Sequence, residues 1–445
     1  MMPDLRSLLD YAKRQGARDA ELYLEETSNW NCRVYEGRVD DVQASSGNGL
    51  GVRVTVGDSL GTAFTSDLRD QGCREAVDRA IANAGIAEPD PLREFYSPAQ
   101  SDVYPTLRIY DEALDRVTPE EKIALALRME SMASGRHPLI RKVLSSGIHT
   151  RSQRVTVINT RGVDAFYRSN ALSAFVSVLA SNGGAMQGGH SSTFARKWEE
   201  IDAEKVVDEA VNHAVSLLGG QPVESQDAAV IFDRAIAAQI WGMLGRTLAG
   251  EEARKGRSIF AGRLGQKVAS PLVTLIDDSL RPDGPGACPF DVEGVPKRTF
   301  PLIEEGVLKG FVYDVYTAKK AGTVSTGHAR RSFRSSVSAA PENLYMQPGQ
   351  MSVDDLIAST ENGFLVMEVK GLGVGGFNVV TGDMSVGASG LWIKAGKVVG
   401  PVREVTVAGN WKEMLMEVDA VANDFKWSGV GTPSFRVRKM AVSGR

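Results

Sequence analysis

The sequence is poor in the residues that most often build disulfides, metal sites and membrane spans. Its 445 residues include three cysteines, Cys32, Cys73 and Cys288, which stand far apart and form no CxxC pair. That usage fits a reducing compartment better than a disulfide framework. No apolar run reaches the roughly 18 residues that a bilayer span needs, and the acidic N-terminal residues do not resemble a signal peptide. We therefore expect a cytoplasmic protein.

Basic residues are not in excess either. The formal net charge is −4 and the sequence pI is about 5.9. This balance does not indicate a broad basic surface for nucleic acid, so we expect neither direct nucleic-acid binding nor membrane binding. Arg330, Arg331 and Arg334 nevertheless form a local basic cluster.

Familiar catalytic and cofactor signatures are missing from the sequence. The five histidines, among them His328, show no i, i+4 pair, and there is no HExxH, GxSxG or GxxxxGK[ST] pattern. Cys288 has no histidine near it in sequence. The GLGVGG run at 371–376 is followed by strand and turn residues, whereas a dinucleotide site needs a helix there. These residues alone predict no catalytic or metal-ligating set in this chain.

Length and patterning predict an α+β chain of three domains, because 445 residues exceed one ordinary core. We expect an α+β N-terminal domain at 1–105, an α+β central domain at 106–222, and a β-rich, mainly antiparallel C-terminal domain at 223–445. Four prolines fall within 88–105, and this composition is typical of a linker.

Local signals place the elements of the first two domains. In the first, the pattern predicts helices over 4–15 and 68–84, a strand over 20–27, and a hairpin over 49–68 that turns at Gly57-Asp58. In the second, Thr118 and Glu121 form a capping-box signature for a helix. Strands are then expected over 154–167 and 172–181, with a turn at 160–162, before a helix that follows Asp202.

The last domain opens with a predicted strand at 228–232 and a helix from the N-cap Asp233 to about Ala249. Beyond this helix, glycine-punctuated strands are expected to dominate. The clearest are at 300–316, 364–371, 390–402 and 403–409.

Several ordered motifs in this half resemble the TldD/PmbA family. The runs that carry the resemblance are PFDVEGVPKRTFPLIEEGVLKGFVYDVYTAKKAG (289–322), STGHARR (325–331) and NVVTGDMSVGASGLWIKAGKVVGPVREVTVAGN (378–410). A weaker likeness extends through the segments near Gly51 and Asn159.

TldD-type members of this family carry HExxxH on the helix that opens the last domain. The resemblance implies that their two histidines and a later cysteine hold zinc, with the glutamate as general base. Counting back from the shared RKG at 254–256 aligns that motif with Trp241, Gly242 and Arg246, and residues 423–437 contain no cysteine. Tryptophan cannot ligate zinc and arginine remains protonated. The pattern is that of the PmbA (TldE) type.

The resemblance implies a subunit, itself non-catalytic, of a TldD/TldE-type metalloprotease assembly in proteolysis and peptide maturation. We expect no cofactor in this chain and zinc in a TldD-like partner. Without that partner, a homodimer of this chain is possible. The candidate peptide-binding residues come from the STGHARR and Asn378 runs: His328, Arg330, Arg331, Asn378, Thr381, Asp383 and Ser385. We also expect Arg246 to form an ion pair with Asp383.

Two alternatives remain open from the sequence. One is an autonomous metallopeptidase with unrecognised ligands, so whether this chain is itself an enzyme stays undecided. The other is a regulatory binding protein associated with DNA gyrase, a link that the family's other label, modulator of DNA gyrase, suggests.

Overall fold

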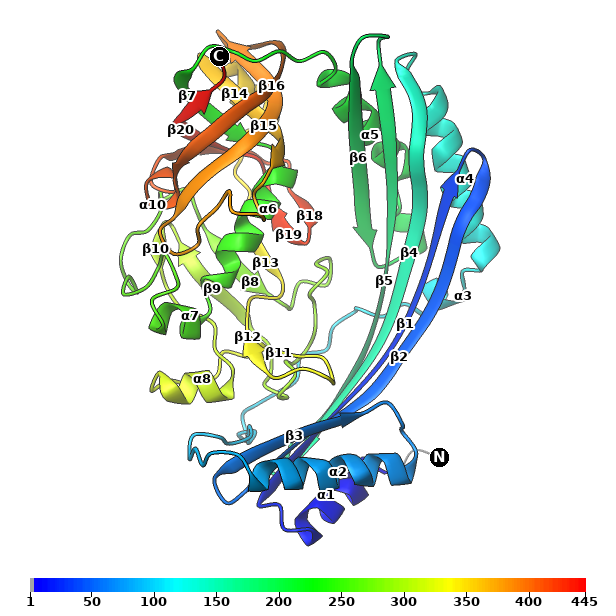
Figure 1. Ribbon diagram of the computed structural model, residues 1–445, viewed down its shortest axis with the longest axis vertical. Helices are drawn as coiled ribbons and strands as arrows, with labels where there is room; N and C mark the ends of the chain where they lie inside the picture. The colour runs from blue at the N-terminus through cyan, green and yellow to red at the C-terminus, as the bar shows by residue number, and fades with distance from the viewer. Residues whose placement is uncertain (1–3) are drawn as a thin grey trace.

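One long antiparallel sheet runs through the first half of the chain. The computed structural model describes residues 4–445; residues 1–3, the start of the segment considered for a signal peptide, lie outside the described residues. The strand order is β3-β2-β1-β4-β5-β6, and the sheet curves along the length of the molecule (Figure 1). Its strands are β1 (Asp19–Tyr35), β2 (Arg38–Val56), β3 (Ser59–Thr65), β4 (Ile140–Asn159), β5 (Asp164–Ser181) and β6 (Met186–Ala195).

The first two predicted domains therefore share a sheet. β1 pairs with β4 in continuous antiparallel register from Glu21 opposite Asn159 to Val34 opposite Ser146. The β2–β3 hairpin turns at Gly57, which has φ +58°, as the Gly57-Asp58 signal predicts. The three-domain division stays a prediction, since the structure joins residues 1–105 and 106–222 through these strands.

Two pairs of helices cover the two ends of this sheet. α1 (Leu5–Arg14) and α2 (Asp70–Gly85) pack near β3, and α4 (Pro119–Gly135) and α5 (Ala203–Ser216) pack at the other end (Figure 1). The capping box of Thr118 and Glu121 is present, and Asp202 accepts the Lys205 backbone N–H at 3.0 Å. These helix predictions are confirmed, and the short helix α3 (Glu112–Arg116) was not predicted.

The segment between α2 and α3 crosses to the other half of the molecule. Residues 88–105 contain no helix or strand, as the proline content predicts. The Tyr104 hydroxyl donates to the Gly294 carbonyl at 2.9 Å, and the Asn159 side chain donates to the Tyr96 carbonyl at 2.8 Å. The linker thereby ties the long sheet to the C-terminal domain.

Residues after 223 form two further six-stranded sheets around one core. The first has the order β16-β15-β14-β7-β20-β17 and the second β10-β9-β8-β13-β19-β18. The first comprises β7 (Gln226–Phe232), β14 (Asn362–Lys370), β15 (Asp383–Lys394), β16 (Lys397–Asn410), β17 (Val418–Val421) and β20 (Phe435–Ser443). The second comprises β8 (Leu275–Asp278), β9 (Thr299–Glu304), β10 (Val307–Leu308), β13 (Leu344–Met346), β18 (Lys426–Ser428) and β19 (Val430–Thr432). A short pair, β11 (Ala329–Arg330) and β12 (Ser338–Ala339), lies apart from both.

The helices of this half are short. α6 (Arg234–Arg246) begins after the predicted N-cap Asp233, whose side chain accepts the Ala235 N–H at 2.8 Å. The others are α7 (Gly250–Arg254), α8 (Val315–Lys320), α9 (Val353–Ala358) and α10 (Trp411–Met414). Many strands with few helices in this half confirm the α+β class with a β-rich C-terminal region.

Two element predictions in this half are wrong in detail. The 300–316 run does not stay extended, because Asp314 caps α8 by accepting the Thr317 N–H at 2.7 Å. α6 ends at Arg246 and not near Ala249. Just after its last residue, the Thr247 hydroxyl donates back to the Leu244 carbonyl at 2.7 Å. In both cases a side-chain hydrogen bond to the backbone overrides the wider pattern.

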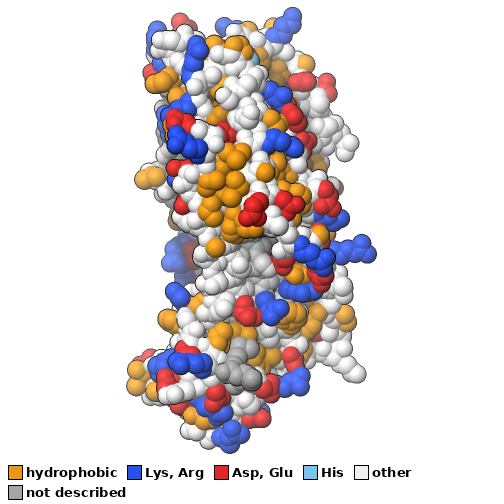
Figure 2. Space-filling view, turned by 90° about the vertical axis from the view of Figure 1, so that its right-hand side faces the viewer, with side chains coloured by type: hydrophobic (Ala, Val, Ile, Leu, Met, Phe, Trp, Pro, Cys, Tyr) orange, Lys and Arg blue, Asp and Glu red, His pale blue; other side chains and the backbone are white. Residues whose placement is uncertain are grey.

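The outer face of the molecule carries apolar side chains as well as charges. Figure 2 shows a group of them in the upper half of the face on the right of Figure 1, where α4 lies. Within residues 4–445, no helix is both long and apolar enough to cross a bilayer.

Candidate functional site

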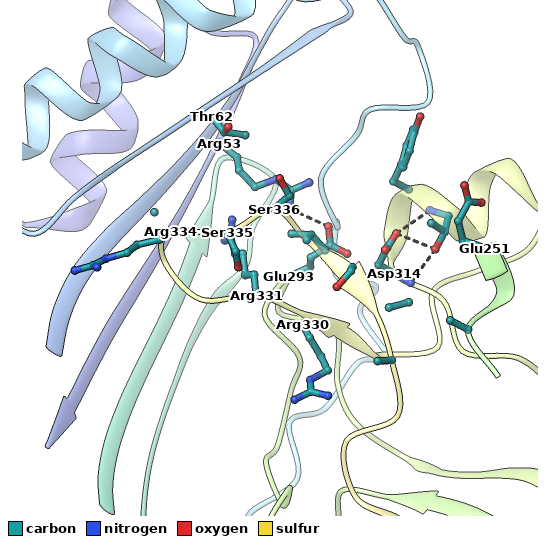
Figure 3. Close-up of a pocket in the computed structure, with 18 of the residues that line it drawn as sticks. Arg53, Thr62, Glu251, Glu293, Asp314, Arg330, Arg331, Arg334, Ser335 and Ser336 are labelled. Carbon is teal, nitrogen blue, oxygen red and sulfur yellow. Dashed lines mark hydrogen bonds and ion pairs between the residues drawn. The ribbon is translucent and has the colours of Figure 1, made fainter. Parts of the chain in front are cut away.

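A large cavity separates the long sheet from the C-terminal domain. Its volume is about 1660 Å³. β2 and β3 supply one wall, and α6, α7, α8 and the 330–344 segment supply the other (Figure 3). The walls thus come from segments that are far apart in the sequence, which is why no local motif predicts the cavity.

One stripe of α6 and its C-terminal extension lines the cavity. It consists of Gly242, Gly245, Arg246 and Ala249, at the i, i+3, i+4 and i+7 spacing that places residues on one helix face. A β-carbon at position 242 would have Val430 Cγ2 as its nearest neighbour, at 3.8 Å. The helix therefore meets the cavity with bare backbone at Gly242 and with one long side chain, whereas Leu344 covers Gly245, where a β-carbon would lie 2.7 Å from Leu344 Cδ2.

Trp241 belongs to the buried face of α6, which adjoins this stripe. It is fully buried, with its ring centroid 6.2 Å from that of Phe435. Of the three aligned motif positions, Gly242 and Arg246 thus line the cavity, whereas Trp241 is part of the core.

These three residues do not fit the zinc that the family's catalytic type implies. An indole offers no lone pair to a metal, a guanidinium stays protonated, and glycine has no side chain. The hairpin of β18 and β19, which contacts α6, contains no cysteine. Across residues 4–445, no three His, Cys, Asp or Glu side chains are placed to hold a metal ion together.

The expected ion pair between Arg246 and Asp383 is wrong. Arg246 is exposed, so its charge needs no buried partner. Asp383 is also exposed and accepts hydrogen bonds from Thr381 Oγ1 at 2.7 Å and Asn410 Nδ2 at 2.8 Å. These hydrogen bonds lower the pKa of Asp383, the bond from Thr381 contributing most.

The other residues of that run share this surface turn. Asn378 organises it through its side-chain oxygen, which accepts the Val380 N–H at 2.9 Å. Asn378, Thr381 and Ser385 are exposed. In the described part of the chain, the cavity lining includes no residue from 378–385, so the two groups of candidate peptide-binding residues lie apart.

The STGHARR run divides between the cavity and the interior. Arg330 is exposed and lines the cavity, with its Nε 3.5 Å from Glu342 Oε1. Arg331 also borders the cavity, yet its side chain is 3% exposed and donates to Glu21 Oε1 at 2.7 Å. His328 is buried, with Nε2 3.3 Å from Asp277 Oδ1. A histidine in this position orders the interior and does not face a ligand.

A buried charge network joins the long sheet to the C-terminal domain at the base of the cavity. Arg53 Nη1 lies 2.9 Å from Glu293 Oε1 (Figure 3). The same atom lies 3.2 Å from Glu21 Oε1. Glu293 also accepts the Val315 N–H at 2.8 Å. Burial raises the pKa of Glu293 and lowers that of Arg331. No local sequence signal marks Arg53, Glu21 or Glu293, because their partners are distant in the chain.

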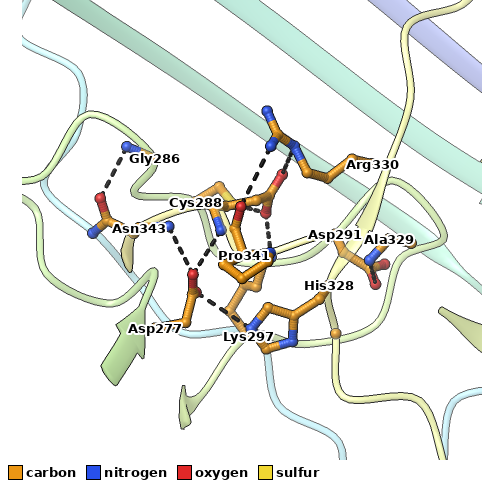
Figure 4. A network of polar contacts seen from close by, with 12 residues as sticks. Asp277, Gly286, Cys288, Asp291, Lys297, His328, Ala329, Arg330, Pro341 and Asn343 are labelled. Carbon is orange, nitrogen blue, oxygen red and sulfur yellow. Dashed lines mark hydrogen bonds and ion pairs between the residues drawn. The ribbon is translucent and has the colours of Figure 1, made fainter. Parts of the chain in front are cut away.

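A second network lies behind Arg330 (Figure 4). Asp277 accepts the backbone N–H groups of Glu342 and Asn343 at 2.6 and 3.0 Å. Lys297 is buried against the Glu342 carboxylate. Burial lowers the pKa of Lys297, but the neighbouring groups Glu342, Cys288, Asp277 and Asp291 together outweigh burial and leave that pKa raised. The network fixes the segment that carries Glu342 into the cavity wall.

Cys288 adjoins this network, and its surroundings do not favour a reactive thiolate. It is buried, its Sγ lies 3.8 Å from Glu342 Oε2, and burial raises the pKa of its thiol well above the ordinary value. A neutral, enclosed thiol is a poor nucleophile.

Comparison with known proteins accounts for nearly the whole chain. The PmbA/TldA metallopeptidase domain 1 matches residues 20–84, the central domain 112–218 and the C-terminal domain 225–444. The chain is 27% identical to a metalloprotease PmbA homolog of Haemophilus influenzae, over 98% of this chain and 94% of the relative. It is 26% identical to a metalloprotease TldD homolog of the same organism, over 99% and 96% respectively.

Solved structures share the same fold. A Thermotoga maritima protein described as a candidate modulator of a DNA gyrase superimposes with a TM-score of 0.91, at 24% identity and over 99% of both chains. TldE from Thermococcus kodakarensis gives 0.89 at 22% identity, over 99% of this chain and all of that one. With three successive domain matches in the family's order, the chain belongs to the PmbA/TldD family.

Proposed function

We propose that this chain is the PmbA/TldE-like, non-catalytic subunit of a TldD/TldE-type metalloprotease assembly that acts in proteolysis and peptide maturation. The observation that carries the proposal is the residue set at the family's metal positions. Trp241 is packed in the core, Gly242 is bare and Arg246 is a permanent cation. Such a set cannot activate a metal-bound water.

In this proposal the cavity receives the peptide and the partner supplies the zinc. A cavity of about 1660 Å³ with open backbone at Gly242 on one wall suits an extended chain. This chain's residues bind and orient the peptide, and its partner cleaves it. The partner is a TldD-like chain in the cytoplasm, with a homodimer as the form of this chain alone.

The test compares this chain alone, a TldD-like chain alone and the two purified together. Each preparation is assayed for zinc content and for cleavage of an unfolded peptide. We expect well under one zinc per copy of this chain, and efficient cleavage only by the pair. Stoichiometric zinc together with peptidase activity in this chain alone would refute the proposal.

A further inference from the structure

Most cations that line the cavity are already neutralised. Eight arginine and lysine side chains line it together with six carboxylates. Arg53 faces Glu21 and Glu293, Arg331 faces Glu21, and Arg330 lies beside Glu342. Charges paired in this way hold the walls together and leave little capacity for a ligand.

Arg246 is different. Its side chain is exposed and lines the cavity. Among residues 4–445, its guanidinium has no carboxylate at ion-pair distance and no hydrogen-bond acceptor, whereas Lys255 on the same wall pairs with Glu251 at 3.0 Å. Two other lining arginines also lack a carboxylate, but Arg79 donates to the Phe64 carbonyl at 3.1 Å and Arg334 lies over the Phe333 ring at 4.8 Å. Its planar set of donors therefore remains free.

The surroundings of Arg246 allow close approach by a ligand. The neighbouring positions on the stripe are Gly242, Gly245 and Ala249, so Arg246 is the only long side chain there. Leu344 and Val430 add apolar contacts nearby, since β-carbons at 245 and 242 would have them as nearest neighbours. Leu344 covers Gly245, since a β-carbon there would lie 2.7 Å from Leu344 Cδ2, so a peptide backbone can approach the helix at Gly242 while an anionic group reaches the guanidinium.

We propose that Arg246 binds a carboxylate of the peptide, an inference that rests on the proposed function because a carboxylate is the anionic group a peptide carries. A guanidinium matches a carboxylate through two parallel N–H···O bonds. The carboxylate comes either from the peptide's C-terminus or from an aspartate or glutamate side chain. Arg246 is thus a binding residue that selects acidic or C-terminal segments.

The experiment uses the complex of this chain with a TldD-like partner, and dansyl-labelled peptides of alanine and serine. One peptide has a free C-terminal carboxylate, the second a C-terminal amide, and the third an amide with one internal aspartate. We expect one or both carboxylate peptides to bind about ten-fold more tightly than the plain amide in fluorescence anisotropy. Which of the two does so identifies the source of the carboxylate.

Variants of this chain assign the preference to Arg246. Arg246→Gln should remove it, and Arg246→Lys should keep part of it, because lysine retains the charge without the planar donors. The matched control is Arg128→Gln, a change at an exposed arginine of α4 outside the cavity, which should leave the preference intact. Thermal melting checks that each variant folds.

The outcomes separate the two proposals. Equal binding of all three peptides, or an unchanged preference in Arg246→Gln, overturns the role of Arg246 while peptide cleavage by the pair still stands. Failure of the complex to bind or cleave any peptide overturns the proposed function as well.

Discussion

The ring of Phe333 lies directly on the backbone of Gly49. A β-carbon at Gly49 would sit 2.1 Å from Phe333 Cε2, and one at Gly51 would sit 2.9 Å from the Phe333 carbonyl oxygen. Phe64 adds an edge-on contact, with the ring centroids 6.2 Å apart. The segment after STGHARR is therefore seated on the sheet through two glycines of β2, beside the ion pair of Arg331 with Glu21.

Gly49→Ala should unseat this segment. The new methyl group cannot coexist with the Phe333 ring, so we expect a loss of about 1–3 kcal/mol of stability and faster proteolysis within 331–338. Urea denaturation and limited proteolysis measure the two effects. Gly85→Ala is the control, because a β-carbon there meets nothing within 4 Å; an equal loss in that variant would contradict the packing argument.

Removing the centre of the buried charge network should be costly. Arg53→Met leaves Glu21 and Glu293 buried without their shared cation, and we expect a loss of about 3–5 kcal/mol. Arg18→Met breaks the exposed pair with Asp58, at 2.8 Å, and a longer contact with Asp19, at 3.4 Å, and should cost at most about 1 kcal/mol because Asp19 keeps its ion pair with Arg161. Urea midpoints of the two variants test the difference, and similar midpoints would argue against the network as the joint between sheet and C-terminal domain.

Stability should fall with rising pH because of Asp291. Burial, followed by the charge of Glu293, raises the pKa of Asp291 to about 7, against about 3.9 in an unfolded chain. The folded chain then keeps a proton that the unfolded chain loses. The contribution of Asp291 to the free energy of unfolding is fully present below about pH 4. It is lost as the pH approaches 7, by roughly 1.4 kcal/mol per pH unit.

Comparison with Asp291→Asn isolates this effect. The variant should show a smaller decline in unfolding free energy between pH 5 and pH 7, whatever its absolute stability. Asp383→Asn, at an exposed carboxylate, should keep the slope of the wild type. Parallel curves for wild type and Asp291→Asn would show that Asp291 is ionised in the folded chain.

Restoring the family's metal motif should fail because of one residue. Trp241 is fully buried against Phe435, so Trp241→His should cost about 3 kcal/mol. Gly242→Glu and Arg246→His alter exposed or open positions and should change little. The triple variant should therefore melt at the temperature of Trp241→His alone, without tight zinc binding. Zinc uptake at unchanged stability would show that the core can release the tryptophan.

Local sequence signals predicted the elements well where a cap or a turn fixes them. Thr118 with Glu121, Asp202 and Asp233 each begin a helix as expected, and Gly57 turns the hairpin. These features involve contacts within four residues, which a single sequence displays. Asp314 was misread within a predicted strand, because its capping role depends on the competition between two local structures.

The site was less predictable because it is built from contacts between residues that are far apart in the chain. Family motifs pointed to Gly242, Arg246 and Arg330, which do line the cavity. The sequence could not show that Arg331 would be buried against Glu21, since 310 positions separate them. Nor could it show that the turn around Asp383 lies apart from the cavity, because a sequence motif does not show where its residues lie in the folded chain.

The pairing of β1 with β4 also constrains how the chain can fold as it is synthesised. β1 and β2 can pair as a hairpin early, since they are adjacent in the chain. The opposite edge of β1 cannot be fully paired until β4, which ends at Asn159, has left the ribosome, with β3, α2, the linker, α3 and α4 made in between. A nascent chain thus carries an open strand edge through that interval, when it is most prone to pair with another chain. Slowing translation between residues 86 and 139 would lengthen that exposure, and a chaperone that shields strand edges would act on this protein at that stage.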